Sequence, residues 1–166
     1  MEAKERYDKH YEESTVINED AKEVFGYVDN HANFSSHMNK SSWMMGGGRM
    51  DTHVDEGQGQ KVGSHILMSG KVFGIEVALD EVVTIHEPPR RKTWETVGTP
   101  KLIVIGDYQM GLVIEPWHDT SNLTASIDYS LPNSLKTRWV GQLFGGIYAK
   151  WCVGQMVNGT QNYFNT

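Results

Sequence analysis

The chain has 166 residues, of which 39% are hydrophobic, and this composition is typical of a folded domain with its own core. Fifteen basic and 21 acidic residues give a formal net charge of -6, which disfavours a nucleic-acid backbone as partner. The single cysteine, Cys152, excludes an intramolecular disulfide and a zinc site built on paired cysteines.

The sequence predicts a single domain over residues 1–166, with residues 1–9 as a solvated, mobile lead-in. Met1–Glu13 is charged throughout and does not have the pattern of a secretory signal. We therefore expect the protein in the cytoplasm.

The first predicted elements are one strand and two helices. The strand covers Tyr11–Ile17, and Asn18 is the expected cap of the helix that follows. A second, short helix is expected to begin at Asp29 or Asn30 and to run through Phe34–Met38. The apolar positions with helical spacing in the first helix are Ala21, Val24, Phe25 and Val28.

After these helices the hydrophobic period changes to two, which is typical of strands. Short turns separate the predicted strands, so successive strands should pair as antiparallel hairpins. The turns are Glu56–Gly59, Gly74, Pro88–Pro89, Gly98–Pro100 and His118–Asp119. The strands are Trp43–Val54, Val62–Phe73, Ile75–Glu87, Arg91–Val97, Gly106–Glu115 and Asn122–Leu131.

The last predicted element is a helix over Thr137–Phe164, about 42 Å long at 1.5 Å per residue. Pro132 ends the preceding strand, and Asn133 or Ser134 is the expected cap. Helical spacing gathers an apolar arc that should face the core. This arc consists of Val140, Phe144, Ile147, Tyr148 and Trp151, and it is extended by Trp139, Leu143 and Val157.

A seam of small residues runs along the flank of this arc and consists of Gly141, Gly145, Cys152 and Gly159. Each glycine in a helix costs up to about 1 kcal/mol relative to alanine, so the seam needs a compensating close backbone contact or a bound ligand. The spacing of Gly141 and Gly145 also occurs in membrane helices, but polar residues interrupt the run, so no membrane span is expected. We expect the helix to lie across the concave face of a sheet.

The order of strand, two helices, six strands and long helix resembles the helix-grip fold of the START-like or SRPBCC superfamily of polyketide cyclases, dehydratases and lipid-transport proteins. The resemblance covers Tyr11–Phe164 and rests on this order, on the segment Ile17–Val28 and on the aromatic-rich last helix. It implies an α+β fold in which a curved antiparallel sheet of about seven strands grips the helix around a hydrophobic cavity. Members carry lipids, sterols or polyketides, and some are cyclases or dehydratases. No catalytic motif of a particular member is present in this chain.

Strand alternation predicts which side chains face the cavity. The inward positions that we do not assign to the ligand are Val62, Ser64, Ile66, Val72, Val77, Val83, Ile85, Thr96, Ile114, Leu123 and Ala125. The residues expected to contact a ligand are Met45, Met68, Leu79, Glu81, Trp94, Tyr108, Met110, Leu112, Ile127, Tyr129, Phe144, Tyr148 and Trp151.

Glu81 is the one acidic residue on these predicted apolar faces. Burial raises the pKa of a carboxyl group that meets no cation, so Glu81 is a candidate general acid or an anchor for a polar ligand group. In the alternative interpretation a β-bulge turns Glu81 outward, or the carboxylate pairs with Arg49 or Arg91.

Three other patterns bear on metal binding, phosphate binding and the shape of the cavity. His53, Asp55 and His65 could approach one another on neighbouring strands, but helical metal-ligand spacings are missing, so neither a metal nor a cofactor is expected. Gly46–Gly48 lacks the Lys-Ser/Thr of a phosphate-binding loop and is interpreted as a bend. The methionines near Trp43 fit a cavity mouth or an ordinary core equally well; they are Met38, Met44, Met45 and Met50.

The sequence therefore predicts a protein that binds a hydrophobic or amphipathic small molecule between the sheet and the last helix. One alternative is an enzyme of the cyclase, dehydratase or hydrolase kind, with Glu81 and either Tyr108 or Tyr129 as acid and base. Another is an interaction module without ligand, in which the glycine seam packs against a partner helix or against a second copy in a homodimer.

Overall fold

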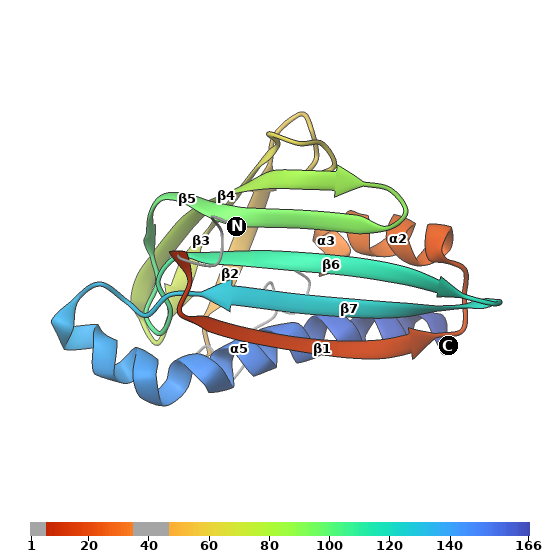
Figure 1. Cartoon of the computed structure of the whole chain (residues 1–166). Coiled ribbons are helices and arrows are strands. Elements are labelled where there is room, and N and C mark those ends of the chain that lie inside the picture. The colour runs from red at the N-terminus through yellow and green to blue at the C-terminus, as the bar shows by residue number, and fades with distance from the viewer. Residues whose placement is uncertain (1–5, 35–46) are drawn as a thin grey trace.

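The computed structural model describes residues 6–34 and 47–166. In this part of the chain, one antiparallel sheet of seven strands accompanies two short helices and one long helix, which confirms the predicted α+β class (Figure 1). The elements are β1 (Lys9–Ile17), α2 (Ala21–Asp29), α3 (His31–Phe34), β2 (Arg49–Val54), β3 (His65–Val72), β4 (Ile75–Glu87), β5 (Arg91–Lys101), β6 (Tyr108–Trp117), β7 (Thr120–Tyr129) and α5 (Leu135–Phe164).

The strand order is β1-β7-β6-β5-β4-β3-β2, so every strand from β2 to β7 pairs with its neighbour in sequence. β1, the first strand of the chain, pairs with the last strand β7 over its whole length, from Lys9 opposite Tyr129 to Ile17 opposite Ser121. In Figure 1, α5 runs along one face of the sheet, and α2 and α3 lie together behind the strands, near the β4–β5 turn. The core therefore lies between the concave face of the sheet and these helices.

The helix after β1 begins two residues later than predicted. Asp20, and not Asn18, caps α2, since its carboxylate accepts hydrogen bonds of 2.9 Å from the backbone N–H groups of Lys22 and Glu23. The short α3 ends at Phe34. The end of this predicted helix, residues 35–38, and the start of the predicted strand at Trp43 lie outside the described residues.

The strand boundaries agree best at β4, which covers the predicted range Ile75–Glu87. β3 begins at His65, because residues 61–63 form a turn in which Gly63 has a φ of 85° and Val62 is exposed. The predicted turn at Gly98–Pro100 is wrong, since β5 continues to Lys101 and pairs with Ala78 beyond a register shift in the β4–β5 ladder.

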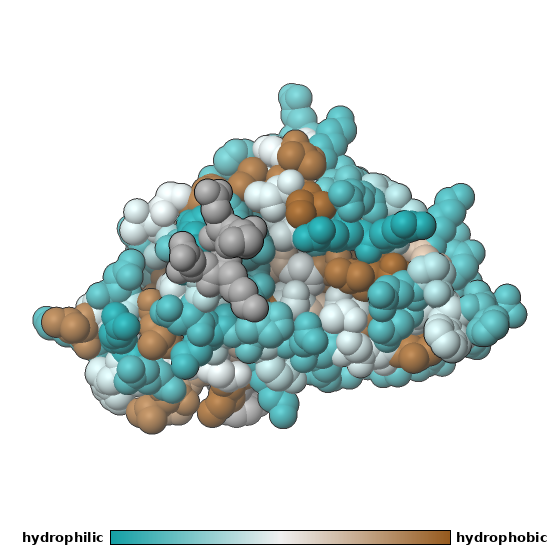
Figure 2. Space-filling model, in the orientation of Figure 1, coloured by the Kyte–Doolittle hydropathy of each residue, from teal (hydrophilic) through white to brown (hydrophobic). Residues whose placement is uncertain are grey.

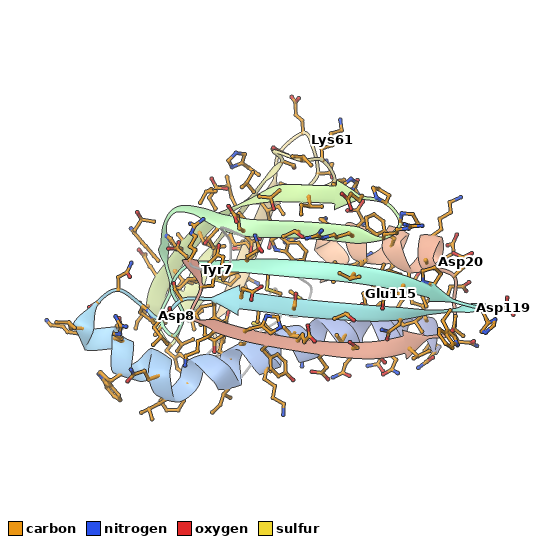
Figure 3. The ribbon with its side chains drawn as sticks, in the orientation of Figure 1. Tyr7, Asp8, Asp20, Lys61, Glu115 and Asp119 are labelled. Carbon is orange, nitrogen blue, oxygen red and sulfur yellow. The ribbon has the colours of Figure 1, made fainter. Side chains whose placement is uncertain are left out.

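The lead-in differs from the expectation over the residues that the structure describes. Tyr7 is buried and β1 already begins at Lys9. Arg6 lies 3.5 Å from the Glu95 carboxylate and 3.9 Å from that of Asp107. Figure 3 places Tyr7 near the beginning of β6, far from Lys61 in the β2–β3 turn. From residue 6 onward the chain is therefore packed against the sheet.

The core-facing side of α5 overlaps only in part with the predicted apolar arc: Val157 is buried, and Tyr148 and Trp151 pack partly buried against the core. Phe144 is 50% exposed and Ile147 is 57% exposed, whereas Gly141 and Gly145 are buried. The buried side consists of Gly141, Gly145, Ala149, Cys152, Val153, Val157 and Thr160. In Figure 1 the N-terminal part of α5 extends past β1 and β7, and Figure 2 shows apolar residues at the surface in this region.

Close backbone contact explains two glycines of the seam. A Cβ atom at Gly141 would lie 2.8 Å from the Val104 carbonyl oxygen and 2.5 Å from Pro132 Cδ, and one at Gly145 would lie 3.2 Å from the same oxygen. Gly159 has open space where a Cβ atom would be. Because the N-terminal part of the seam packs within the chain, it is not available to a partner helix. Among the described residues, α5 included, no helix combines the length and apolarity that crossing a membrane requires.

Candidate functional site

Alternation along the central strands builds the floor of the candidate site. Tyr108, Met110, Leu112 and Ile114 of β6 are all buried, as are Leu123, Ala125, Ile127 and Tyr129 of β7. On β4, Val77, Leu79, Glu81 and Val83 are buried, whereas Ile85 is only half-buried after a second register shift in the β4–β5 ladder. The inward faces of these strands therefore follow the predicted parity.

An inner cavity of about 40 Å³ lies between this floor and α5. Its polar groups come from several elements: Glu81 from β4, Tyr108 from β6, His31 from α3, and Tyr148 and Cys152 from α5. The rest of its wall is apolar or aromatic and consists of Met68, Leu79, Trp94, Leu102, Ile105, Met110, Ile127 and Met156. We call this space the inner chamber.

The Glu81 carboxyl group is the polar centre of the inner chamber and is only 2% exposed. Its Oε1 accepts a hydrogen bond from the Tyr108 hydroxyl, and its Oε2 lies 4.0 Å from His31 Nε2. Among residues 6–34 and 47–166, Oε2 has no hydrogen-bond partner. The alternatives for Glu81 are therefore wrong: it does not turn outward, and Arg49 and Arg91 are exposed rather than paired with it.

Burial raises the pKa of the Glu81 carboxyl to about 7. The hydrogen bond from Tyr108, the N–H of the nearby Trp94 indole and the positive charge of Lys92 act in the opposite direction without cancelling the effect of burial. The pKa of the Tyr108 hydroxyl is raised well above its usual value by burial and by the adjacent Glu81. Near neutral pH the site thus holds a carboxyl group that exchanges its proton easily, beside a hydroxyl group that keeps its own.

A buried ionic cluster of Asp29, His86 and Lys92 lies next to Trp94 of the inner-chamber wall. Lys92 Nζ lies 2.9 Å from Asp29 Oδ1 and donates to the Asp29 carbonyl oxygen at 3.0 Å, while His86 Nε2 lies 3.0 Å from the same carboxylate. Lys92 is 1% exposed, and its ammonium lies 5.8 Å from the centre of the Trp94 ring. The cluster joins the end of α2 to β4 and β5, and it positions Trp94 in the chamber wall.

A second, wider space of about 510 Å³ adjoins the inner chamber, and we call it the outer groove. The two spaces share Leu102, Ile105 and Tyr148 as lining residues. The other walls come from β2, the β3–β4 hairpin, the loop after β5 and the N-terminal half of α5. They consist of Met50, Val72, Phe73, Ile75, Val77, Ile103, Val104, Val140, Phe144 and Ile147. This wall is almost entirely apolar, in contrast to the polar centre of the inner chamber.

The structure brings most of the predicted ligand-contact residues to these two spaces. Met68, Leu79, Glu81, Trp94, Tyr108, Met110, Ile127 and Tyr148 line the inner chamber, and Phe144 and Tyr148 line the outer groove. Leu112, Tyr129 and Trp151 line neither space. Tyr129, the other candidate acid or base, packs near Gly145 and does not line the chamber that holds the Glu81 carboxyl. Met45 lies outside the described residues.

Sequence reasoning missed His31, Met156 and the loop residues Leu102 and Ile105, since no strand periodicity covers them. It also passed over Lys92, although a signal was available there. Lys92 shares its parity with Trp94 and Thr96 on β5, so alternation alone places its side chain on the buried face.

Two of the candidate metal ligands, Asp55 and His65, are instead engaged in hydrogen bonds at the β2–β3 connection and with Asp80. Asp55 accepts hydrogen bonds from the Ser64 hydroxyl at 2.5 Å and from the His65 backbone N–H at 2.8 Å, and these bonds lower the pKa of its carboxyl. His65 Nδ1 lies 2.9 Å from Asp80 Oδ1. Over the described ranges, no group of three or more His, Cys, Asp or Glu residues is placed to hold a metal ion.

Comparison with known proteins identifies the architecture. No protein-family model matches the sequence, and no curated protein sequence matches it. Among solved structures, the Zhui aromatase/cyclase from a Streptomyces species superposes with a TM-score of 0.71 at 11% identity over 95% of this chain and 93% of that one. Norcoclaurine synthase from Thalictrum flavum gives 0.65 at 11% identity over 93% and 92%. Ara h 8.0201 gives 0.61 at 9% identity over 95% and 97%. These superpositions establish a shared fold, and at identities this low they establish the fold alone.

Proposed function

The chain has the helix-grip fold of the START-like or SRPBCC superfamily, and from this premise we propose that it binds a hydrophobic or amphipathic small molecule, lipid-like or polyketide-like, between the sheet and α5. The observation that carries the proposal is the outer groove. Its volume of about 510 Å³ lies in the range of sites that bury a drug-sized ligand, and its walls are apolar.

The position of the groove also supports the proposal. Phe144 and Ile147 are half-exposed at its wall, and Phe73 at the β3–β4 turn is 61% exposed. Large apolar side chains at the rim of a cavity are typical of a binding site, because a ligand that covers them removes apolar surface from water. The inner chamber behind Tyr148 then offers hydrogen bonds to a polar end of the ligand.

The test is a binding titration with an environment-sensitive naphthalene dye, followed by displacement with a varied panel of apolar compounds. Ile147→Glu places a charge in the groove and should weaken dye binding about tenfold or more. Leu143→Glu is the matched control, because Leu143 lies one turn earlier on the same helix, is 61% exposed and does not line the groove. If wild-type protein binds neither the dye nor any panel compound, the proposal is wrong.

A second candidate function is proton-transfer catalysis on a bound ligand, and the pair of Glu81 and Tyr108 favours it. A carboxyl group with a pKa of about 7 is well matched to general acid–base work near neutral pH. Two of the structural neighbours are by name a cyclase and a synthase. Turnover of a bound carbonyl compound that Glu81→Gln abolishes, with dye binding retained, would establish this function over simple carriage.

A further inference from the structure

We propose that the inner chamber selects ligands by one small uncharged polar group, a ketone carbonyl or a hydroxyl, which hydrogen-bonds to Glu81 Oε2 while the apolar body of the ligand fills the outer groove. This inference rests on the proposed binding function and adds the chemical class of the ligand. Three features support it: the unpartnered Oε2 atom of Glu81, the sizes of the two spaces and the charges that surround Glu81.

Glu81 presents one oxygen to the chamber. Oε1 is occupied by the Tyr108 hydroxyl, whereas Oε2 is buried and has no hydrogen-bond partner in the part of the chain that the structure describes. A buried polar atom without a partner is unfavourable, so a ligand group that bonds to Oε2 gains free energy by supplying the missing hydrogen bond.

The two volumes divide the ligand into a small head and a large body. The inner chamber of about 40 Å³ has room for a group of very few heavy atoms, whereas the outer groove of about 510 Å³ accepts a long chain or a ring system. Tyr148 lies at the junction and lines both spaces. In the proposed binding mode the ligand passes a narrow polar end by Tyr148 to Glu81 and leaves its apolar part in the outer groove.

The charges around Glu81 favour an uncharged head. Lys92 acts on Glu81 through its positive charge, but its ammonium is already bound by Asp29 at 2.9 Å. Asp80, on the same strand, adds a negative charge and lies 2.9 Å from His65. A carboxylate ligand would thus bring a second negative charge to Glu81 with no uncommitted lysine or arginine beside it among the described residues.

The remaining titratable groups facing Glu81 are Tyr108 on β6, Tyr148 and Cys152 on α5, and His31 on α3. Burial raises the pKa of both tyrosines well above 10 and that of the Cys152 thiol to about 12, so these three stay uncharged in the pH range of the test. His31 Nε2 lies 4.0 Å from Oε2 and is the other group whose charge can change there.

The protonation state of Glu81 then decides what it offers. Because Oε1 accepts from Tyr108, the uncharged carboxyl carries its proton on Oε2 and can donate it to a ketone. The carboxylate can only accept, so it can bind a hydroxyl group but not a ketone. Burial places the pKa of Glu81 at about 7, which brings this change into an accessible range.

The experiment compares three ligands of equal chain length, 2-decanone, 1-decanol and decanoate, by displacement of the naphthalene dye at pH 5.5 and pH 8.5. We expect the Kd of 2-decanone to rise about tenfold or more between these pH values, because only a few per cent of a group with a pKa of 7 stays protonated at pH 8.5. The Kd of 1-decanol should change by less than about threefold, since it can donate as well as accept. Decanoate should be the weakest of the three at pH 8.5.

Glu81→Gln is the decisive variant, because its amide donates a hydrogen bond at every pH. In this variant 2-decanone should bind equally well at both pH values. Glu76→Gln is the matched control: it makes the same substitution at an exposed position of the same strand and should keep the pH dependence of wild type.

Three outcomes would overturn the inference and leave the proposed function standing: the dye binds but no ligand of the series displaces it, decanoate binds tightest at pH 8.5, or the pH dependence survives in Glu81→Gln and so belongs to His31. If the dye itself does not bind at either pH, the proposed function is wrong and this inference falls with it.

Discussion

Glu81 and Tyr108 belong to strands that do not pair, and their side chains meet above Thr96 of the strand between them. Thr96 lies opposite Glu81 in the β4–β5 ladder, and its hydroxyl accepts a hydrogen bond from the Tyr108 backbone N–H at 3.1 Å. β4 and β6 are about 10 Å apart at ordinary strand spacing, so a long side chain from each is needed to bridge them. The small Thr96, fully buried, leaves the space in which they meet.

The pH dependence of stability tests the burial of Glu81. Its pKa is about 7 in the folded protein, against 4.5 for an ordinary glutamate, so the unfolded chain loses this proton first as the pH rises. The contribution of Glu81 to stability should therefore fall between pH 4.5 and 7 and stay low above 7. We expect the free energy of unfolding of Glu81→Gln, relative to wild type, to rise by about 3 kcal/mol between pH 4 and pH 8. Urea denaturation at several pH values measures this difference.

Glu76→Gln is the control for that series, since Glu76 is exposed on the same strand. Its free energy of unfolding, relative to wild type, should stay nearly constant with pH. A Glu81→Gln variant that is clearly less stable than wild type at pH 8 would show instead that the fold requires the carboxylate.

Tyr108→Phe tests the hydrogen bond directly. The bond from Tyr108 lowers the pKa of Glu81, so its loss should raise that pKa above the wild-type value. At pH 8 the variant should also lose about 1.5–3 kcal/mol of stability, as is usual for a hydrogen bond to a charged group. Carbon-13 NMR of labelled glutamate reports the pKa. Tyr129→Phe should leave it unchanged, because Tyr129 does not line the inner chamber; equal shifts in both variants would contradict the assigned pair.

The glycines of α5 should respond to alanine in opposite directions. At Gly141 a Cβ atom would lie 2.5 Å from Pro132 Cδ and 2.8 Å from the Val104 carbonyl oxygen, so Gly141→Ala should destabilise the protein by about 1–3 kcal/mol. At Gly159 the space is open, so Gly159→Ala should stabilise it by up to about 1 kcal/mol. Thermal melts of the two variants provide the measurement.

Gly145→Leu extends this comparison, because a seam that borders ligand space would accept the larger side chain. The Val104 carbonyl oxygen and Tyr129 Cε2 lie 3.2 and 3.4 Å from the Cβ position, so we expect overpacking and a lower melting temperature. A variant that melts at or above the wild-type temperature would contradict the close contact.

Asp29→Asn tests the buried ionic cluster. It leaves the Lys92 ammonium buried without its counter-charge, which should cost about 3–5 kcal/mol, and adding Lys92→Met should recover much of that loss. Asp80→Asn is the control: it breaks a more exposed pair with His65, and its effect on urea denaturation should stay below about 1 kcal/mol. Equal losses of stability in Asp29→Asn and Asp80→Asn would mean that burial does not strengthen the interaction between Asp29 and Lys92.

Strand alternation was enough to predict the element order and the inward position of Glu81, because side chains on a strand have only two faces to choose between. The last helix was harder. Hydrophobicity and helical spacing predict that Phe144 and Ile147 face the core. Instead, the Val104 carbonyl packs against Gly141 and Gly145, so the glycine side of the helix faces the core and Phe144 and Ile147 stay half-exposed. That contact joins a loop to a helix far along the chain, and no local pattern in the sequence reports it.

In the candidate site, too, residues on regular strands could be predicted from the sequence, whereas residues on loops and short helices could not. Residues on regular strands, such as Leu79, Trp94 and Met110, were predicted to contact a ligand, and they line the inner chamber. Leu102 and Ile105 follow the end of β5, which runs past Gly98 and Pro100 where turn chemistry predicted a stop. His31 comes from a helix of four residues, too short for its buried side to be read from periodicity.

The loop after β5 limits how this protein could be redesigned. Residues 102–105 form a wall of the outer groove, and the Val104 carbonyl is also the surface against which α5 rests. If the proposed function holds, substitutions there would change ligand preference and loosen the packing of α5 at the same time. Exchanging the half-exposed Phe144 and Ile147, or Phe73 at the rim, would alter what the groove accepts and leave that anchor untouched. Mutagenesis to change what the outer groove binds should therefore begin at its rim and avoid residues 102–105.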